Sequence, residues 1–153
     1  MNVFIDTEFT DLLNPTIISI GFVAEDGRSL YLELLDWTPA QCSDFVKEVV
    51  LPLLDQEHPM TDGEAAQIIH KFFDEIKEPV KLMADSGIDF QLFGELLFSG
   101  QKIKPRKLAE ALIISPSIEG ELVRENLYAG GLRRHHAVDD AKALMAAWKC
   151  TNA

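Results

Sequence analysis

The first 35 residues hold three short runs of apolar and β-branched residues, at positions 2–6, 16–24 and 29–35. Turn-forming residues separate the runs, and Asp26-Gly27 lies between the second and the third. Short runs with these boundaries are typical of β-strands, and an Asp-Gly pair is typical of a hairpin turn. The pattern therefore predicts that the chain begins with a three-stranded antiparallel meander.

Apolar residues change to helical spacing after the meander. Thr38-Pro39 resembles an N-cap followed by proline in the first turn, which predicts a helix that continues to Pro52. Thr61 and Glu64 have the spacing of a capping box, and a stripe of apolar residues at helical spacing follows them. Both segments are therefore predicted to be amphipathic helices.

The second half of the chain alternates strand and helix patterns. It predicts a strand at 79–84, a helix at 89–98, a short strand at 102–106, a helix at 107–114 and a final helix at 137–149. Strands that come first and alternate with helices later indicate a sheet with an antiparallel and a parallel part. The predicted fold class is therefore α/β, a mixed sheet flanked by helices.

Composition limits the functions that the chain can have. The 153 residues, 47% of them apolar, fit a single domain over 1–153. A formal net charge of −11 argues against a wide basic surface that grips a nucleic-acid backbone. No apolar run suits a membrane span and no secretion leader is visible, so the expected location is the cytoplasm. Cys42 and Cys150 agree, because isolated cysteines fit reduced thiols better than a disulfide framework.

Four carboxylates follow segments that can meet at one edge of the sheet. Asp6 and Glu8 lie at the end of the first strand, on the same side of the backbone. Asp89 follows the fourth strand, and Asp140 lies one turn into the last helix, five residues after His135. Carboxylates gathered in this way raise one another's pKa values or bind cations, and oxygen ligands favour Mg²⁺ or Mn²⁺. Two such ions about 3.5–4 Å apart are an arrangement for displacement at phosphorus, so the sequence predicts a site for two divalent cations.

The motifs around these residues resemble those of the DEDDh 3′–5′ exonucleases. Asp6-Thr7-Glu8 matches the first motif, and residues 135–141, which read H-x-A-x-x-D-A, match the last. Residues 84–89 resemble the middle motif, with Asp89 in the metal-binding place. The resemblance implies a ribonuclease H-like fold, in which three antiparallel strands precede parallel ones. The compact chain looks most like stand-alone bacterial and phage exoribonucleases that resemble ribonuclease T.

The same resemblance implies a role for each residue. Asp6 would bridge the two cations. Glu8 and Asp140 would complete the shell of one ion, Asp89 would hold the other, and His135 would accept the proton of the attacking water. The implied activity is removal of nucleoside monophosphates from the 3′ end of a single-stranded nucleic acid, with RNA favoured over DNA, by an enzyme that forms a homodimer. The alternative is an inactive module of this fold that binds nucleic acid or a protein partner.

Five residues are expected to touch the substrate: Phe9, Thr10, Leu12, Arg133 and Arg134. By resemblance, Thr10 and Leu12 contact the terminal nucleotide, although Asp11 replaces the usual glycine between them. Phe9 can stack on a base, and the two arginines can hold phosphates. A second candidate for phosphate contacts is the basic stretch, which consists of Lys102, Lys104, Arg106 and Lys107.

Two of these assignments have a competitor. Asp85 competes with Asp89 for the cation, and the position of Asp89 in the motif favours Asp89. His136 competes with His135 for the role of base, and the five-residue step to Asp140 favours His135. Asp139 is interpreted as a solvated neighbour or as a partner of the helix dipole in the first turn, because adjacent positions on a helix face about 100° apart.

Overall fold

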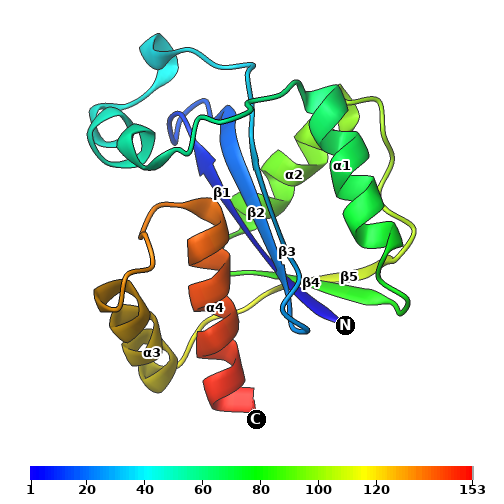
Figure 1. Cartoon of the computed structure of the whole chain (residues 1–153), viewed down its shortest axis with the longest axis vertical. Helices are drawn as coiled ribbons and strands as arrows, with labels where there is room; N and C mark the ends of the chain where they lie inside the picture. Colours follow the sequence, from blue (N-terminus) through cyan, green and yellow to red (C-terminus); the bar gives the residue numbers. More distant parts are fainter. Residues whose placement is uncertain (153) are drawn as a thin grey trace.

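The computed structural model describes residues 1–152, which form a five-stranded mixed sheet flanked by helices (Figure 1). The strands lie in the order β3-β2-β1-β4-β5. Their bounds are Asn2–Phe9 (β1), Ile17–Ala24 (β2), Ser29–Glu33 (β3), Val80–Ala84 (β4) and Leu108–Ile113 (β5). Neighbours pair antiparallel from β1 to β3, whereas β4 pairs parallel with both β1 and β5. The predicted α/β class and its order of antiparallel and parallel strands are confirmed.

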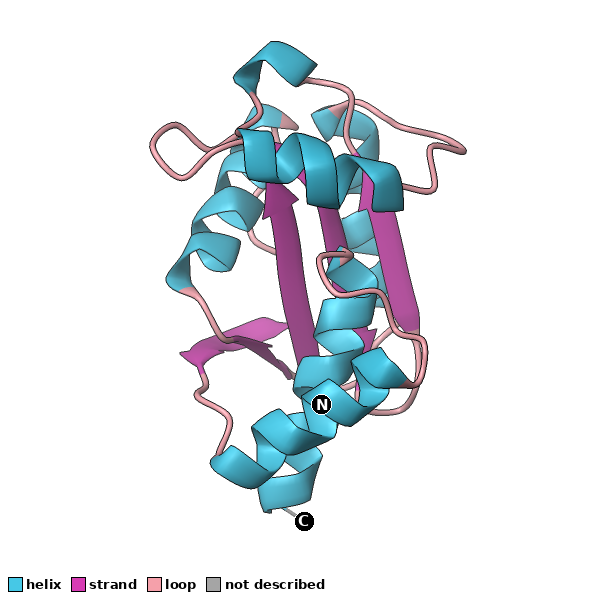
Figure 2. Cartoon of the chain, turned by 90° about the vertical axis from the view of Figure 1, so that its left-hand side faces the viewer, coloured by secondary structure: helices cyan, strands magenta, loops and turns pink. Residues whose placement is uncertain are grey.

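The α-helices cover both faces of this sheet. Their bounds are Asp62–Asp74 (α1), Gly87–Ser99 (α2), Ile118–Ala129 (α3) and Ala137–Asn152 (α4). Helices α1 and α2 lie on one face and α4 on the other, with α3 packed against α4 (Figures 1 and 2). Side chains alternate along β1, so Val3 and Ile5 pack toward α1 and α2 while Phe4 packs toward α4. None of the helices in residues 1–152 is long and apolar enough to cross a membrane.

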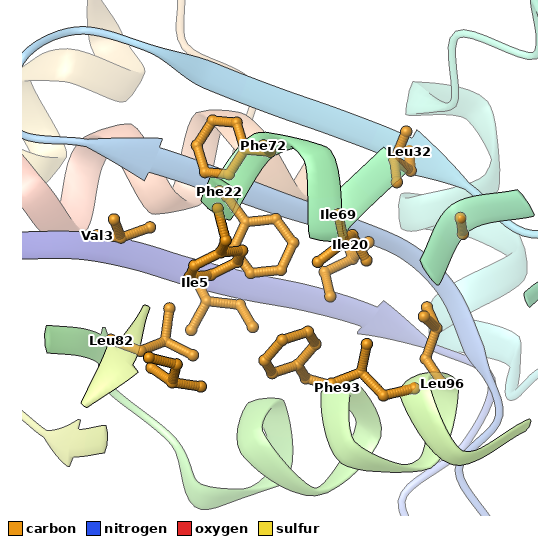
Figure 3. Close-up of a cluster of buried hydrophobic side chains, with 14 of the residues drawn as sticks. Val3, Ile5, Ile20, Phe22, Leu32, Ile69, Phe72, Leu82, Phe93 and Leu96 are labelled. Atoms are coloured by element: carbon orange, nitrogen blue, oxygen red, sulfur yellow. The ribbon is translucent and has the colours of Figure 1, made fainter. Parts of the chain in front are cut away.

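The larger core lies between the sheet and helices α1 and α2. Figure 3 shows Ile5 and Phe22 of the sheet facing Ile69 and Phe72 of α1 and Phe93 of α2. The rings of Phe22 and Phe93 meet edge to face, with centroids 5.4 Å apart. This packing holds α2 against the sheet, and Asp89 lies in the first turn of that helix.

Two predictions for residues 101–129 are wrong. Residues 108–113 form the edge strand β5 instead of a helix, because their backbone pairs with β4 from Lys81 to Ala84 and this pairing outweighs the helix preference of Ala and Glu. No strand forms at 102–106. Helix α3 was not predicted, although Ser117 is its N-cap and accepts a hydrogen bond from the Gly120 amide at 3.1 Å.

The helix predicted after Thr38 is also wrong as a continuous element. The backbone is extended at Cys42, which separates a 3₁₀ turn at Pro39–Gln41 from a π-helical turn at Val46–Val50. A second 3₁₀ turn, Leu51–Leu53, contains Pro52. This segment passes over the end of the sheet, next to the start of α4 (Figure 1). It contributes apolar side chains to the pocket described below.

Candidate active site

Strand β1 carries two carboxylates beyond the point where its parallel neighbour leaves it. The strand continues to Phe9, three residues past the predicted end, so Asp6 and Glu8 lie within it. Pairing with β4 covers only residues 2–4 of β1. By alternation, Asp6 and Glu8 point to the same face as Phe4, toward α4. Beyond residue 4, this edge of β1 is not paired with β4, and the predicted site residues lie near it.

Asp89 reaches this edge from the first turn of α2. Ser86 is the N-cap of the helix, and Asp89 is almost completely buried. The Thr7 amide and the Thr7 hydroxyl both donate to Asp89 Oδ1, at 3.0 and 2.7 Å. These bonds fix one carboxylate oxygen, and no donor within residues 1–152 reaches Asp89 Oδ2. Thr7 is a positioning residue that the sequence motif contains but that was not singled out.

Asp140 reaches the edge because α4 begins directly against β2. Gly21 pairs with Asp6 across the β1–β2 ladder. A Cβ atom at Gly21 would lie 2.4 Å from the Val138 amide nitrogen, which no side chain tolerates. The glycine therefore allows the first turn of α4 to touch the sheet and brings Asp140 close to Glu8.

His135 is held in a rare backbone conformation immediately before α4. Its φ of +65° lies in the left-handed region, which costs a non-glycine residue about 1–2 kcal/mol. Its amide donates to Asp140 Oδ2 at 2.9 Å, and its ring meets Phe45 edge to face at 5.1 Å. Backbone strain of this kind is frequent at functional sites. His135 lines the pocket, whereas His136 is buried and stacks on Tyr31, with ring centroids 4.2 Å apart.

Six residues form two groups that could each hold a metal ion. The first group is Glu8, His135 and Asp140, and the second is Asp6, Asp85 and Asp89. Within each group one ligand atom per residue lies within 4.8 Å of the others. Both competitors for the middle position, Asp85 and Asp89, thus belong to the second group.

The donor set fits divalent cations. Five of the six residues offer carboxylate oxygens, which suit Mg²⁺ or Mn²⁺. Asp6 Oδ2 is buried and has no hydrogen-bond partner among the described residues. A buried charged oxygen without a donor is costly, and a bound cation would satisfy it.

The carboxylates hold protons more tightly than usual. Burial, followed by repulsion from Asp140 and Asp89, raises the pKa of Glu8 to about 8. Burial also raises the pKa of Asp89 to about 6, although hydrogen bonds from Thr7 oppose the shift. The pKa values of Asp6 and Asp140 are raised as well, chiefly by burial. Cation binding would therefore displace protons from this cluster.

A pocket of about 380 Å³ opens onto the first group. Its polar lining includes Asp6, Glu8, Asp140 and His135, together with Thr7, Asp11 and Ser43. The apolar wall consists of Phe9, Leu12, Phe45, Val46 and Val50. Phe9 and Leu12 thus lie where a substrate base could touch them. Thr10 does not line the pocket, because its buried hydroxyl accepts a hydrogen bond from the Thr16 amide at 3.0 Å.

The two predicted phosphate-binding arginines are engaged in ion pairs. Arg133 pairs with Asp139 at 2.8 Å and with Asp55 at 2.7 Å. Arg134 pairs with Glu125 and lies over the ring of Tyr128. Neither arginine lines the pocket.

Asp139 is not the solvated neighbour that its helix position predicted. Its side chain is buried and also accepts a hydrogen bond from Lys142 Nζ at 3.0 Å. Burial alone would raise the pKa of Asp139, but the bonds from Arg133 and Lys142 outweigh it and lower the pKa.

The basic stretch lies far from the carboxylates. Lys107 immediately precedes β5, and β5 runs parallel to β4 and β1. The stretch is therefore at the end of the sheet where these strands begin, whereas the carboxylates lie toward the end where they finish. Lys107 Nζ donates to the Lys77 carbonyl, and Lys102, Lys104 and Arg106 are exposed.

Solved structures of exonuclease I share this fold. An E. coli complex with single-stranded DNA and zinc matches with a TM-score of 0.63 at 12% identity, over 97% of this chain and 39% of that chain. An E. coli complex with a dT13 oligonucleotide matches with a TM-score of 0.61 at 12% identity, over 98% of this chain and 40% of that chain. The enzyme from Methylocaldum szegediense matches with a TM-score of 0.61 at 17% identity, over 95% of this chain and 38% of that chain.

These likenesses show the fold, an α/β architecture of the ribonuclease H-like class. The three solved structures named above are exonucleases, and the chain spans about two fifths of their length. No protein-family model and no curated protein sequence matches the chain.

Proposed function

We propose that the protein is a metal-dependent 3′–5′ exonuclease that acts on single-stranded nucleic acid. The observation that carries the proposal is the pair of acidic groups at the open edge of β1, with a histidine in the first group and a pocket beside it. The fold shared with exonuclease I supports the same reaction class. The motif resemblance described above favours RNA over DNA.

The side chains divide the work of such a reaction. Glu8, Asp140 and Asp6 would hold one divalent cation, and Asp6 with Asp89 or Asp85 would hold a second. When bound, the two ions supply Lewis acidity and a water of lowered pKa for displacement at phosphorus.

His135 would accept the proton of the attacking water, because its ring lines the pocket beside two carboxylates. The apolar wall would hold the terminal base and exclude water. Phe9 and Phe45 offer rings for stacking, which contributes about 1–3 kcal/mol per base.

An inactive binding module is the second candidate function. Asp6 Oδ2, which is buried and has no hydrogen-bond partner among residues 1–152, argues against it, because a surface kept only for binding gains nothing from that cost. Homodimer formation and a cytoplasmic location remain predictions from the sequence.

The test is hydrolysis of 5′-labelled single-stranded RNA and DNA of one sequence, with Mg²⁺, Mn²⁺ or chelator. We expect stepwise shortening from the 3′ end that needs a divalent cation and is faster on RNA. His135→Ala should slow the reaction by about 10²–10⁴-fold, the usual contribution of a general base. His58→Ala is the matched control, because His58 is exposed and outside this pocket. Absence of shortening with either metal would contradict the proposal, and equal rates on both polymers would remove the RNA preference.

A further inference from the structure

Helix α3 places a permanent positive charge against the second acidic group. Arg124 Nη1 lies 2.9 Å from Asp85 Oδ2 and 3.4 Å from Glu121 Oε1. The Arg124 side chain is only 17% exposed, so solvent screens its charge less than that of a surface arginine. Within residues 1–152, no other Lys or Arg forms an ion pair with any member of the two groups.

The same helix face also contacts the first group. Tyr128, one turn after Arg124, donates its hydroxyl to Asp140 Oδ1 at 2.7 Å. Helix α3 packs along α4, which carries Asp140. A single face of α3 is thus connected to both groups, through a charged contact in one case and a neutral hydrogen bond in the other.

A fixed guanidinium beside a cation site has a predictable effect. Arginine keeps its charge at all physiological pH values, so Arg124 neutralises part of the acidic cluster in the metal-free protein. A divalent cation that enters the group of Asp6, Asp85 and Asp89 must do so next to that charge. At separations of about 5–6 Å in a water-like dielectric, the repulsion between charges of +1 and +2 corresponds to roughly tenfold in affinity.

We propose that Arg124 is a built-in counter-cation that competes with the second divalent ion for Asp85 and so sets the ion concentration at which the second group fills. The inference rests on the proposed cation site and extends it to regulation of that site. Arg124 is a positioning residue in this account, since it acts through Asp85.

The proposal predicts opposite changes in two properties. Removing the charge with Arg124→Gln should tighten binding of the more weakly bound Mn²⁺ ion, the one in the second group, about tenfold. The reason is that this ion no longer competes with an arginine for Asp85. The same change should lower the melting temperature of the metal-free protein, because the carboxylates lose their internal cation. A merely structural role for Arg124 would lower both stability and affinity.

The experiment is a Mn²⁺ titration of the whole chain without nucleic acid, followed by calorimetry and by the electron paramagnetic resonance signal of free Mn²⁺. Arg124→Lys should retain near-wild-type affinity, since the charge remains. Asp85→Asn should weaken the same binding step. Arg28→Gln is the matched control, because Arg28 pairs with Asp26 at the exposed hairpin between β2 and β3 and should leave Mn²⁺ binding unchanged.

The outcomes separate this inference from the proposed function. Wild-type protein that binds Mn²⁺, together with an Arg124→Gln variant that binds it no more tightly, would overturn the role of Arg124 and leave the cation site intact. Wild-type protein that binds no Mn²⁺ would overturn both.

Discussion

Two adjacent aspartates at the start of α4 have different hydrogen-bond partners and opposite pKa shifts. Asp139 is buried but receives Arg133 and Lys142, and its pKa is lowered. Asp140 is also buried, its donors within residues 1–152 are the neutral Tyr128 hydroxyl and His135 amide, and its pKa is raised. Of these two consecutive residues, Asp139 is therefore neutralised by cationic side chains and Asp140 is not.

The difference extends to the regions around the two residues. Asp139 belongs to an ion-paired layer formed with Asp55, Arg133 and Lys142, which fastens α4 to the segment before α1. Asp140 belongs to a cluster in which Asp6, Glu8 and Asp89 also have raised pKa values. The protein is able to pair buried carboxylates with cationic side chains. None of these four carboxylates has a cationic side-chain partner in the described part of the chain, and such a cluster could hold a metal ion.

Exchanging each aspartate for asparagine should separate the two regions most clearly. Asp140→Asn should weaken Mn²⁺ binding by more than about 100-fold, beyond the 10–100-fold typical of outer-shell partners. It should also raise the melting temperature of the metal-free protein, because a repelled charge is removed.

Asp139→Asn should do the reverse. It should cost about 1.5–3 kcal/mol of stability, the usual value of hydrogen bonds to charged groups, and leave Mn²⁺ affinity within about threefold. Thermal unfolding and Mn²⁺ titration of both variants give the two readouts. Parallel behaviour of the two variants would remove the distinction between the regions.

Closing the space at Gly21 should disturb both aspartates together. Gly21→Ala places a Cβ 2.4 Å from the Val138 nitrogen, so α4 must shift away from β2. Overpacking of this kind costs about 1–3 kcal/mol or more, which corresponds to roughly 3–10 °C in a domain of this size, and activity should fall as Asp140 moves. Gly94→Ala is the matched control, since no atom lies within 4 Å of its added Cβ and the helix should gain up to about 1 kcal/mol. An unchanged melting temperature in Gly21→Ala would show that α4 does not need this close approach.

The pH dependence of stability should also distinguish the cluster of raised-pKa carboxylates from Asp139, with a smaller effect than the substitutions above. Glu8 has an ordinary pKa of 4.5 and a folded pKa of about 8, so the folded protein binds a proton that the unfolded chain releases. Stability of the metal-free protein is therefore greatest below about pH 4.5 as far as this group is concerned, and is lost as pH rises to about 8. Asp89 acts in the same direction up to about pH 6.

Asp139 acts in the opposite direction, because its pKa is lowered and its stabilisation is lost only as pH falls into the acid range. Melting temperatures from pH 5 to 8 should decrease in chelator and recover with Mn²⁺. A metal-free protein that becomes more stable over this interval would contradict the assigned protonation of the cluster.

Local sequence patterns were sufficient for much of the fold and for the members of the acidic cluster. Strand periodicity located β1 to β4, and the Thr61–Glu64 capping box located the start of α1. The motif spacing indicated Asp6, Glu8, Asp89, His135 and Asp140, which the structure brings to one edge of the sheet.

What local patterns missed depends on contacts between distant residues. Residues 108–113 become a strand because β4 pairs with them, and Asp139 is buried because Asp55 and Arg133 meet beside it. Thr7 and Arg124 each contact a carboxylate that lies 82 or 39 positions away in the sequence, and no local pattern indicates these contacts.

A Mn²⁺ titration of wild-type protein alongside Asp6→Asn shows whether the cluster of raised-pKa carboxylates is a cation site. Asp6 is the half-buried member whose Oδ2 meets no donor within residues 1–152, so its loss should remove at least one bound ion while circular dichroism shows the fold retained. We expect wild-type protein to bind up to two Mn²⁺ per chain at pH 7.5, with release of protons. Equal Mn²⁺ binding by Asp6→Asn and wild type, or none by either, would show that these carboxylates are not a cation site.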